Sequence, residues 1–158
     1  MKKIANIALV AFAFLVAPNA FVNASPRSDS TAATLARPNR PSAAHTTRAL
    51  AERGDAPSQT KLGFMYEHGR GVPPNYGAAV YWYSCAAEQG HATAQYLLGL
   101  MYDKGHGTPR SNVLAYKWLS LAAAHAHPGV REYYLRIRDA VGAKLTPAQL
   151  AEAQLLAH

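Results

Sequence analysis

The chain has 158 residues, of which 49% are hydrophobic and 16% are charged, and this composition permits one folded domain of ordinary size. Its formal net charge of +7 is concentrated near the start, where six basic residues before residue 49 face one acidic residue, Asp29. From residue 49 onward there are 10 basic and 8 acidic residues, a net charge of +2, so this part lacks the basic face that follows a phosphate backbone. We therefore expect no nucleic-acid partner.

The first 24 residues have the pattern of a secretory signal peptide. Two lysines precede an apolar run over residues 4–17, and Val22 and Ala24 occupy the −3 and −1 positions of a cleavage site after Ala24. The apolar run is too short to span a bilayer. We therefore expect an exported protein, periplasmic or secreted, with no stable membrane insertion after signal cleavage. An uncleaved membrane anchor is the alternative.

Residues 25–42 contain three prolines and almost no large apolar side chains. Because such a segment cannot bury enough surface to offset the entropy lost on ordering, we expect a disordered linker here and a folded domain over residues 43–158. The single cysteine, Cys85, cannot form a disulfide within one chain and is predicted to be a small buried side chain. The sequence leaves open whether its thiol is reactive.

The main pattern of the folded part is a gapless repeat with a period of 36 residues. Residues 62–71 return as residues 98–107, and the match extends further along both copies. A fixed period of this length is typical of stacked supersecondary units that cannot bury their apolar faces alone. We place the full repeats at about residues 58–93 and 94–129. The later matching pairs are Pro73 and Pro109, Ala79 and Ala115, Trp82 and Trp118, and His91 and His127.

The predicted elements begin with a lone helix around residues 50–54. Each repeat then has two helices. The first ends at Gly69 or Gly105, because glycine readily adopts the left-handed conformation that closes a helix. The second begins at Asn75 or Ser111, whose side chains can accept hydrogen bonds from the unpaired amides of a helix N-terminus.

The second helix of each repeat carries a small-large-small stripe. In the first copy the stripe consists of Ala79, Trp82 and Ala86, and the same residue types recur 36 positions later. We expect the alanines to let neighbouring helices approach closely while the indole fills the gap between them. The recurring residues are therefore assigned to packing.

The repeat fades after residue 129. Apolar spacing over residues 130–141 predicts one more helix. Thr146, Pro147 and Gln149 then combine an N-cap, a first-turn proline and the third residue of a capping box. We interpret residues 130–158 as a degenerate cap that shields the last apolar face. The apolar residues of its closing helix are Leu150, Leu155 and Leu156.

The second copy contains Ala94, Leu98-Gly99, Tyr102, Gly105-His106-Gly107, Ala115 and Trp118 at fixed spacing. In this pattern the chain resembles the Sel1-like repeat family, which is related to tetratricopeptide arrays, over about residues 49–158. Departures such as Ser58 and Thr108 should not prevent stacking. The resemblance implies an all-α fold, a short right-handed α-solenoid of antiparallel helix pairs with a C-terminal capping helix.

The sequence offers no recognisable catalytic or metal-binding pattern. It lacks His-Glu-x-x-His, a cysteine pair and a Gly-x-Ser-x-Gly nucleophile elbow. His125 and His127 are two positions apart, which turns them away from each other on a helix. We therefore expect no enzyme activity, no metal and no cofactor; a small hydrolase, the alternative, rests on the seven histidines alone.

The resemblance also implies a function, that of an exported, non-enzymatic scaffold or adaptor that binds a protein or peptide through its concave helix surface. The residues that do not recur, Phe64, His68, Leu100 and Lys104, are the strongest candidates. The alternative is a cell-envelope glycan or peptidoglycan binder whose tyrosines stack on sugars. By analogy with tetratricopeptide arrays, the concave face contains Thr60, Phe64, Glu67, His68, Tyr96, Leu100, Asp103, Lys104, Glu132 and Arg136.

Overall fold

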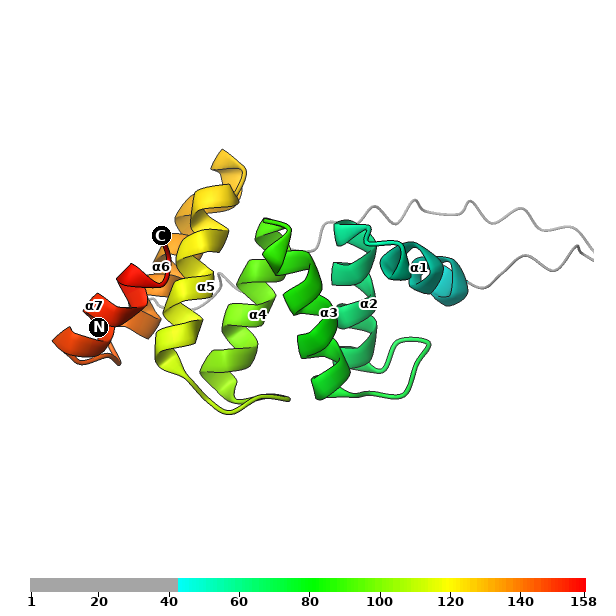
Figure 1. Ribbon diagram of the computed structural model, residues 1–158, viewed down its shortest axis with the longest axis horizontal. Helices are drawn as coiled ribbons and strands as arrows, with labels where there is room; N and C mark the ends of the chain where they lie inside the picture. Colours follow the sequence, from blue (N-terminus) through cyan, green and yellow to red (C-terminus); the bar gives the residue numbers. More distant parts are fainter. Residues whose placement is uncertain (1–42) are drawn as a thin grey trace, which may run out of the picture. The chain divides into compact units, whose positions relative to one another are not determined.

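The computed structural model describes residues 43–158, which form seven α-helices and no strand (Figure 1). The predicted all-α class is confirmed. The predicted signal peptide and linker, residues 1–24 and 25–42, lie outside the described residues. No helix among residues 43–158 is both long enough and apolar enough to cross a membrane. The helices are α1 (Ala43–Glu52), α2 (Ala56–His68), α3 (Tyr76–Glu88), α4 (Ala92–Lys104), α5 (Asn112–His125), α6 (Pro128–Gly142) and α7 (Pro147–Leu155).

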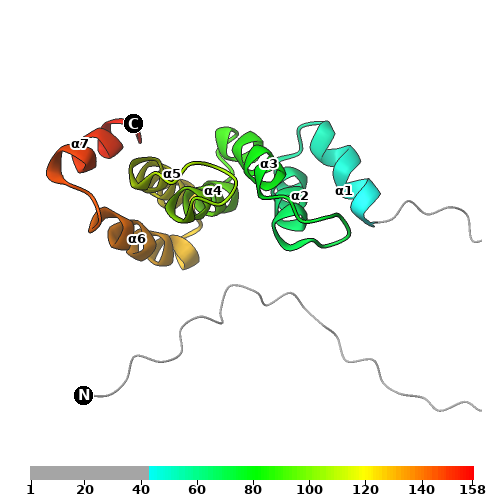
Figure 2. The same cartoon turned by 90° about the horizontal axis from the view of Figure 1, so that it is seen from below.

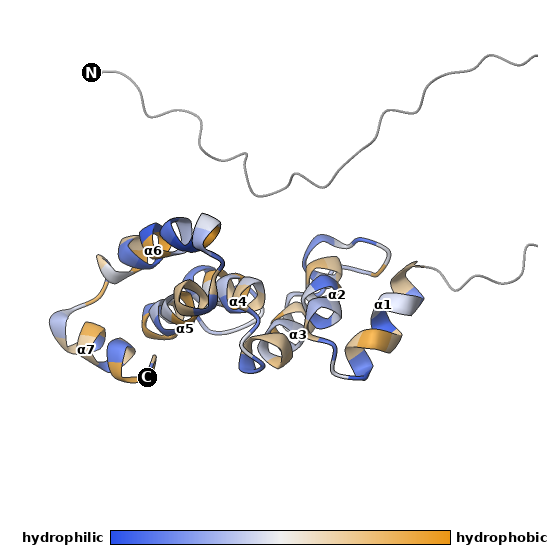
Figure 3. Cartoon of the chain, turned by 90° about the horizontal axis from the view of Figure 1, so that it is seen from above, coloured by the Kyte–Doolittle hydropathy of each residue, from blue (hydrophilic) through white to orange (hydrophobic). Residues whose placement is uncertain are grey.

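Each helix from α1 to α5 packs on the next one in the chain, whereas α7 packs on α5. Figure 1 shows α2, α3, α4 and α5 side by side as successive antiparallel helices. Seen along the helices, α2, α4 and α6 lie along one side of this stack, and α3, α5 and α7 lie along the other (Figures 2 and 3). The first helices of the repeats therefore share a side, as the predicted binding face requires.

The predicted helix ends are confirmed. Gly69 and Gly105 close α2 and α4 in the left-handed conformation, with φ of 65° and 72°. The side chains of Asn75 and Ser111 accept hydrogen bonds from the third backbone amide after each cap, which opens α3 and α5. Different residues therefore perform the same capping role in the two repeats.

The Leu-Gly pair of each repeat is explained by the helix that packs on it. Leu62 and Leu98 are fully buried. A Cβ at Gly63 would lie 2.7 Å from the ring of Tyr83, and a Cβ at the equivalent Gly99 would lie 2.9 Å from Cγ of Leu119. The glycine therefore makes room for one large side chain of the following helix.

This contact corrects the predicted stripe. Tyr83 and Leu119, rather than Trp82 and Trp118, are the large, fully buried side chains of α3 and α5. The two tryptophans are half-buried and pack at the edges of the core clusters. The predicted alanines are buried as expected. The recurring tryptophans therefore mark an edge of the core. The residues at the centre of the core, Tyr83 and Leu119, lie one position further along each helix.

Three further expectations differ from the structure. Helix α6 begins at Pro128 instead of residue 130, because proline lacks an amide hydrogen and fits the first helical position. Cys85 is half-buried and not fully enclosed. The capping box of Thr146 and Gln149 is confirmed at the start of α7. Of the apolar residues predicted for the closing helix, Leu155 at the end of α7 and Leu156 just after it are exposed, so this helix contributes less apolar surface to the cap than expected.

Candidate functional site

The ten predicted partner-binding residues occupy equivalent positions on α2, α4 and α6. Thr60, Tyr96 and Glu132 are 36 residues apart, as are Phe64, Leu100 and Arg136. These three helices lie on the same side of the stack (Figure 3). The side chains nevertheless differ in accessibility and in the contacts they make.

Thr60 faces the interior. It is 8% exposed, and its hydroxyl donates to the carbonyl oxygen of Ala56 at 2.9 Å. Because that hydrogen is used, the hydroxyl oxygen accepts from Nδ1 of His91, at 2.9 Å. His91 precedes the first residue of α4, so this bond joins α2 to the start of the next repeat. A partner on the surface has no access to the Thr60 hydroxyl.

Glu67 and Asp103 are half-buried acceptors that bind other parts of the chain. The hydroxyl of Tyr83 donates to Oε2 of Glu67 at 2.7 Å. Burial, and secondarily the bond to this carboxylate, raises the pKa of Tyr83, which therefore stays neutral. Nζ of Lys144 forms an ion pair with Oδ1 of Asp103 at 2.6 Å. Each carboxylate thus ties its helix to another segment, which leaves less capacity for a partner.

Tyr96 connects α4 to α6. Its ring stacks on that of Tyr134 with the centroids 4.6 Å apart, and its hydroxyl lies 3.0 Å from that of Tyr133. Burial is the main cause that raises the pKa of Tyr96, with the Tyr133 hydroxyl adding to it. The ring is therefore a packing element between repeats.

Six of the ten predicted residues remain at the surface with side chains that a partner can contact. Phe64 is half-buried and stacks on His68 with ring centroids 4.0 Å apart, while the Arg70 guanidinium lies 5.1 Å from the Phe64 ring centroid. Leu100 is half-buried and Lys104 is exposed. Glu132 and Arg136 are exposed on α6. We name this set, Phe64, His68, Leu100, Lys104, Glu132 and Arg136, the binding face.

Two buried glutamines that the sequence analysis missed join the repeats. Nε2 of Gln59 donates to the carbonyl oxygen of Ala51, and Nε2 of Gln95 donates to that of Ala87. On the other side of each amide, Gln89 donates to Oε1 of Gln59 at 2.7 Å. Nδ1 of His125 donates to Oε1 of Gln95 at 2.9 Å. The signal was available, since glutamine recurs at these two positions in register with the repeat.

The histidines do not form a metal site in the part of the chain that the structure describes. No group of three or more His, Cys, Asp or Glu side chains among residues 43–158 is arranged to hold an ion. His68 contacts the carbonyl oxygen of Phe64, His106 packs on Tyr76, and His127 caps α6. The contacts of His68 and His127 lie within one helix or cap, and the contact of His106 joins two turns of the stack.

Comparison with known proteins agrees with the architecture. The Sel1 repeat model matches residues 56–91 and 92–127, two residues before the bounds expected from the sequence. No protein of curated function matches the chain. Sel1 repeat proteins are in general non-catalytic scaffolds for protein interactions.

Two solved structures are similar to the chain. One is c5321, a protective antigen present in uropathogenic Escherichia coli strains and displaying an SLR fold, with 32% identity over 73% of this chain and a TM-score of 0.67. The other is a Sel1 repeat protein from Oxalobacter formigenes, with 38% identity over 52% of this chain and a TM-score of 0.51. This chain spans 24% and 34% of those two chains. The chain is thus a Sel1-like repeat protein, with two tandem repeats in an α-solenoid fold.

Proposed function

We propose that this protein is an exported, non-enzymatic scaffold that binds a protein or peptide through the binding face. The observation that carries the proposal is that the side chains of α2, α4 and α6 fall into two groups that differ in burial and in their contacts. The side chains that join the repeats are buried or half-buried and bonded to other segments of the chain, whereas those of the binding face are half-buried or exposed. The three helices themselves lie on the same side of the stack (Figure 2). The signal-peptide pattern supports export.

The chemistry of the binding face suits an amphipathic segment. Leu100 and Phe64 supply half-buried apolar surface, and Lys104 and His68 follow them by one helical turn. Apolar anchors beside a polar rim are the usual arrangement where a helix or peptide lies in a groove between helices. The basic side chains favour acidic groups next to the apolar anchors of the partner.

A paired set of variants tests the proposal. Leu100→Ser combined with Lys104→Glu alters the binding face, and Tyr81→Ser combined with Glu88→Lys makes a matched change on α3, on the opposite side. Partners are isolated from envelope extracts with the unaltered chain, and one identified protein is purified and titrated against each variant. We expect about tenfold or greater weakening with the first variant only. Equal binding by both folded variants, checked by circular dichroism, overturns the assignment.

Glycan binding, the alternative, requires exposed aromatic rings. Tyr76 and Tyr81 on α3 meet that condition, since they are 47% and 61% exposed. Retention on purified cell-wall material that is lost in Tyr81→Ala supports this function and places it on the opposite side of the stack. Absence of retention removes it.

A further inference from the structure

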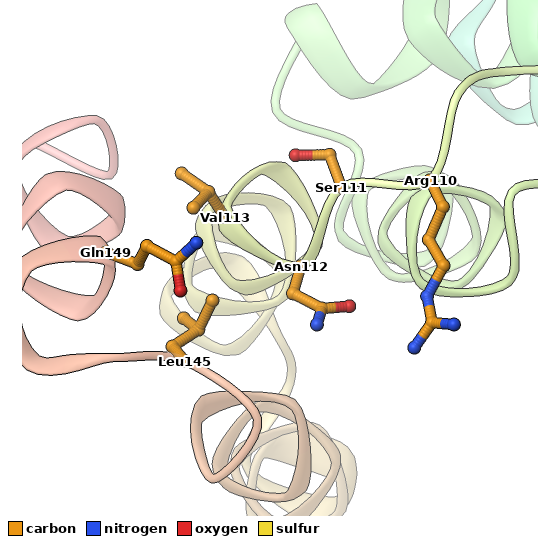
Figure 4. A pocket seen from close by; sticks show the side chains of 6 residues that line it. All are labelled: Arg110, Ser111, Asn112, Val113, Leu145 and Gln149. Atoms are coloured by element: carbon orange, nitrogen blue, oxygen red, sulfur yellow. The ribbon is translucent and has the colours of Figure 1, made fainter.

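A cavity of about 350 Å³ opens where the start of α5 meets the turn between α6 and α7 (Figure 4). Its volume is near the lower end of the range for ligand pockets, about 300–1,000 Å³, so it suits a short segment rather than a folded domain. Arg110, Ser111, Asn112 and Val113 contribute one wall, and Leu145 and Gln149 contribute the other. No residue of the binding face lines it.

Two polar groups at this cavity are available to a ligand. Among residues 43–158 the two ion pairs are formed by Arg138 and Lys144. The Arg110 guanidinium is exposed and is part of neither ion pair. Oδ1 of Asn112 is buried and has no hydrogen-bond partner. Leaving a buried acceptor unpaired is costly, so this oxygen favours a ligand that brings a donor.

The acceptor oxygens of the other two polar side chains of the cavity already accept hydrogen bonds, whereas the Ser111 hydroxyl hydrogen and Nε2 of Gln149 can still donate. Oγ of Ser111 accepts from the backbone amide of Leu114 at 3.2 Å. Oε1 of Gln149 accepts from the backbone amide of Thr146 at 3.0 Å, as part of the capping box. Asn112 thus supplies the acceptor that a ligand's donor can use, and Arg110 supplies the positive charge. In Figure 4 the Asn112 amide lies between Leu145 and the Arg110 guanidinium.

The surrounding turns are basic. The segments 68–76, 104–111 and 142–149 contain Arg70, Lys104, Arg110 and Lys144 and no Asp or Glu. They are neighbours in space, because His106 packs on Tyr76 and Leu145 shares the cavity with Arg110. Asp103, which precedes the second of these segments, forms an ion pair with Lys144, so these two charges cancel and Arg70, Lys104 and Arg110 supply the remaining positive charge. This end of the stack therefore attracts a negatively charged ligand.

We propose that the cavity binds a peptide segment through its carboxylate. The carboxylate accepts hydrogen bonds from the Arg110 guanidinium, which can bind both oxygens. A backbone amide of the peptide donates to Oδ1 of Asn112, and a small apolar side chain packs between Val113 and Leu145. The site is separate from the binding face, and its test does not depend on that face.

The test uses three tetrapeptides with ¹⁵N-labelled full-length chain and follows backbone amide shifts by NMR. Acetyl-Ala-Leu-Asp-Ala-amide carries a side-chain carboxylate, acetyl-Ala-Leu-Ala-Ala carries a free C-terminal one, and acetyl-Ala-Leu-Asn-Ala-amide carries none. We expect saturable shifts at residues 110–114 and 145 with at least one of the carboxylate peptides, and none with the neutral peptide. The peptide that binds more tightly identifies the source of the carboxylate. No saturable shift with either carboxylate peptide at millimolar concentration, or equal shifts with the neutral one, overturns the proposal.

Variants assign the two polar groups. Arg110→Gln should weaken peptide binding about tenfold or more. Arg110→Lys keeps the charge but loses the paired donors, so its affinity should lie between those of Arg110→Gln and the unaltered chain. Arg53→Gln, at an exposed arginine outside the cavity, is the charge control and should change binding less than about twofold. Asn112→Ala should weaken binding while raising the Tm of the peptide-free chain, because it removes the unpaired oxygen. Unchanged binding by Arg110→Gln contradicts the site.

Discussion

Gln59 and Gln95 make the same buried hydrogen bond one repeat apart, each to the carbonyl oxygen eight residues earlier, at 3.1 and 3.0 Å. The acceptors, Ala51 and Ala87, lie near the ends of α1 and α3. Carbonyls at a helix end have no partner within the helix. Each of the two carbonyl oxygens also accepts from the amide of a glycine just after its helix, Gly54 or Gly90, at 3.0 Å. The glutamine adds a second hydrogen bond, which joins that helix end to the next helix.

Replacing Gln95 should lower the stability of the domain. Gln95→Ala removes the bond to Ala87 and leaves His125 without its partner, so we expect the free energy of unfolding to fall by about 1–3 kcal/mol in urea titrations. Gln154→Ala, at an exposed position of α7, is the control and should stay within about 0.5 kcal/mol. A Gln95→Ala variant as stable as this control contradicts the joining role.

Alanine should have opposite effects on stability at two helical glycines, Gly99 of the second Leu-Gly pair and Gly77 near the start of α3. Gly99→Ala should destabilise the chain by about 1–3 kcal/mol, because its Cβ meets Leu119. Gly77→Ala should stabilise it by about 0.5–1 kcal/mol, since the nearest atom to its Cβ is 3.4 Å away and alanine favours the helix. Thermal unfolding of both variants distinguishes them. Equal effects of the same sign would falsify the packing explanation.

The turn before α5 depends on Gly107. Its φ is 71°, and a Cβ there would overlap the backbone of Tyr76 at the start of α3. Gly107→Ala should therefore cost more than backbone strain alone, about 3 kcal/mol or more. Gly54 also has a positive φ, 92°, but an added Cβ there would meet no atom within 4 Å. Gly54→Ala should therefore lower the free energy of unfolding by only about 1 kcal/mol. If the two variants unfold at the same urea concentration, the close approach of the turn to α3 does not explain the need for glycine at position 107.

Stability should also depend on the protonation of His91. Burial lowers the pKa of His91 from its ordinary value of 6.5, and the nearby Asp55 carboxylate offsets part of this effect. As the pH falls, the unfolded chain therefore takes up the His91 proton before the folded chain does. The contribution of neutral His91 to the free energy of unfolding is thus present above pH 6.5 and is lost as the pH falls through the lower pKa of the folded chain. Urea unfolding between about pH 7.5 and 5 should show a smaller loss for His91→Asn than for the unaltered chain. A parallel pH dependence of the two rules out this contribution.

The features that sequence patterns predicted well are those set by local chemistry. Gly69 closes a helix because of its own backbone freedom, and Asn75 caps one because its side chain reaches its own amides. The contacts that were missed depend on residues far along the chain. Thr60 is buried and hydrogen-bonded to His91, 31 positions later, and the cavity forms only where residues 110–113 meet Leu145. No spacing rule connects such pairs before the helices are packed.

The central claim is that a protein partner binds on the side of α2, α4 and α6, and in-cell photo-crosslinking tests it most directly. A benzophenone amino acid is placed at position 100 on α4 in one variant and at the exposed position 81 on α3 in another, and crosslinked products are identified by mass spectrometry. We predict a dominant product with one protein at position 100 that is absent at position 81. No product at position 100, or the same product at both positions, would contradict the claim.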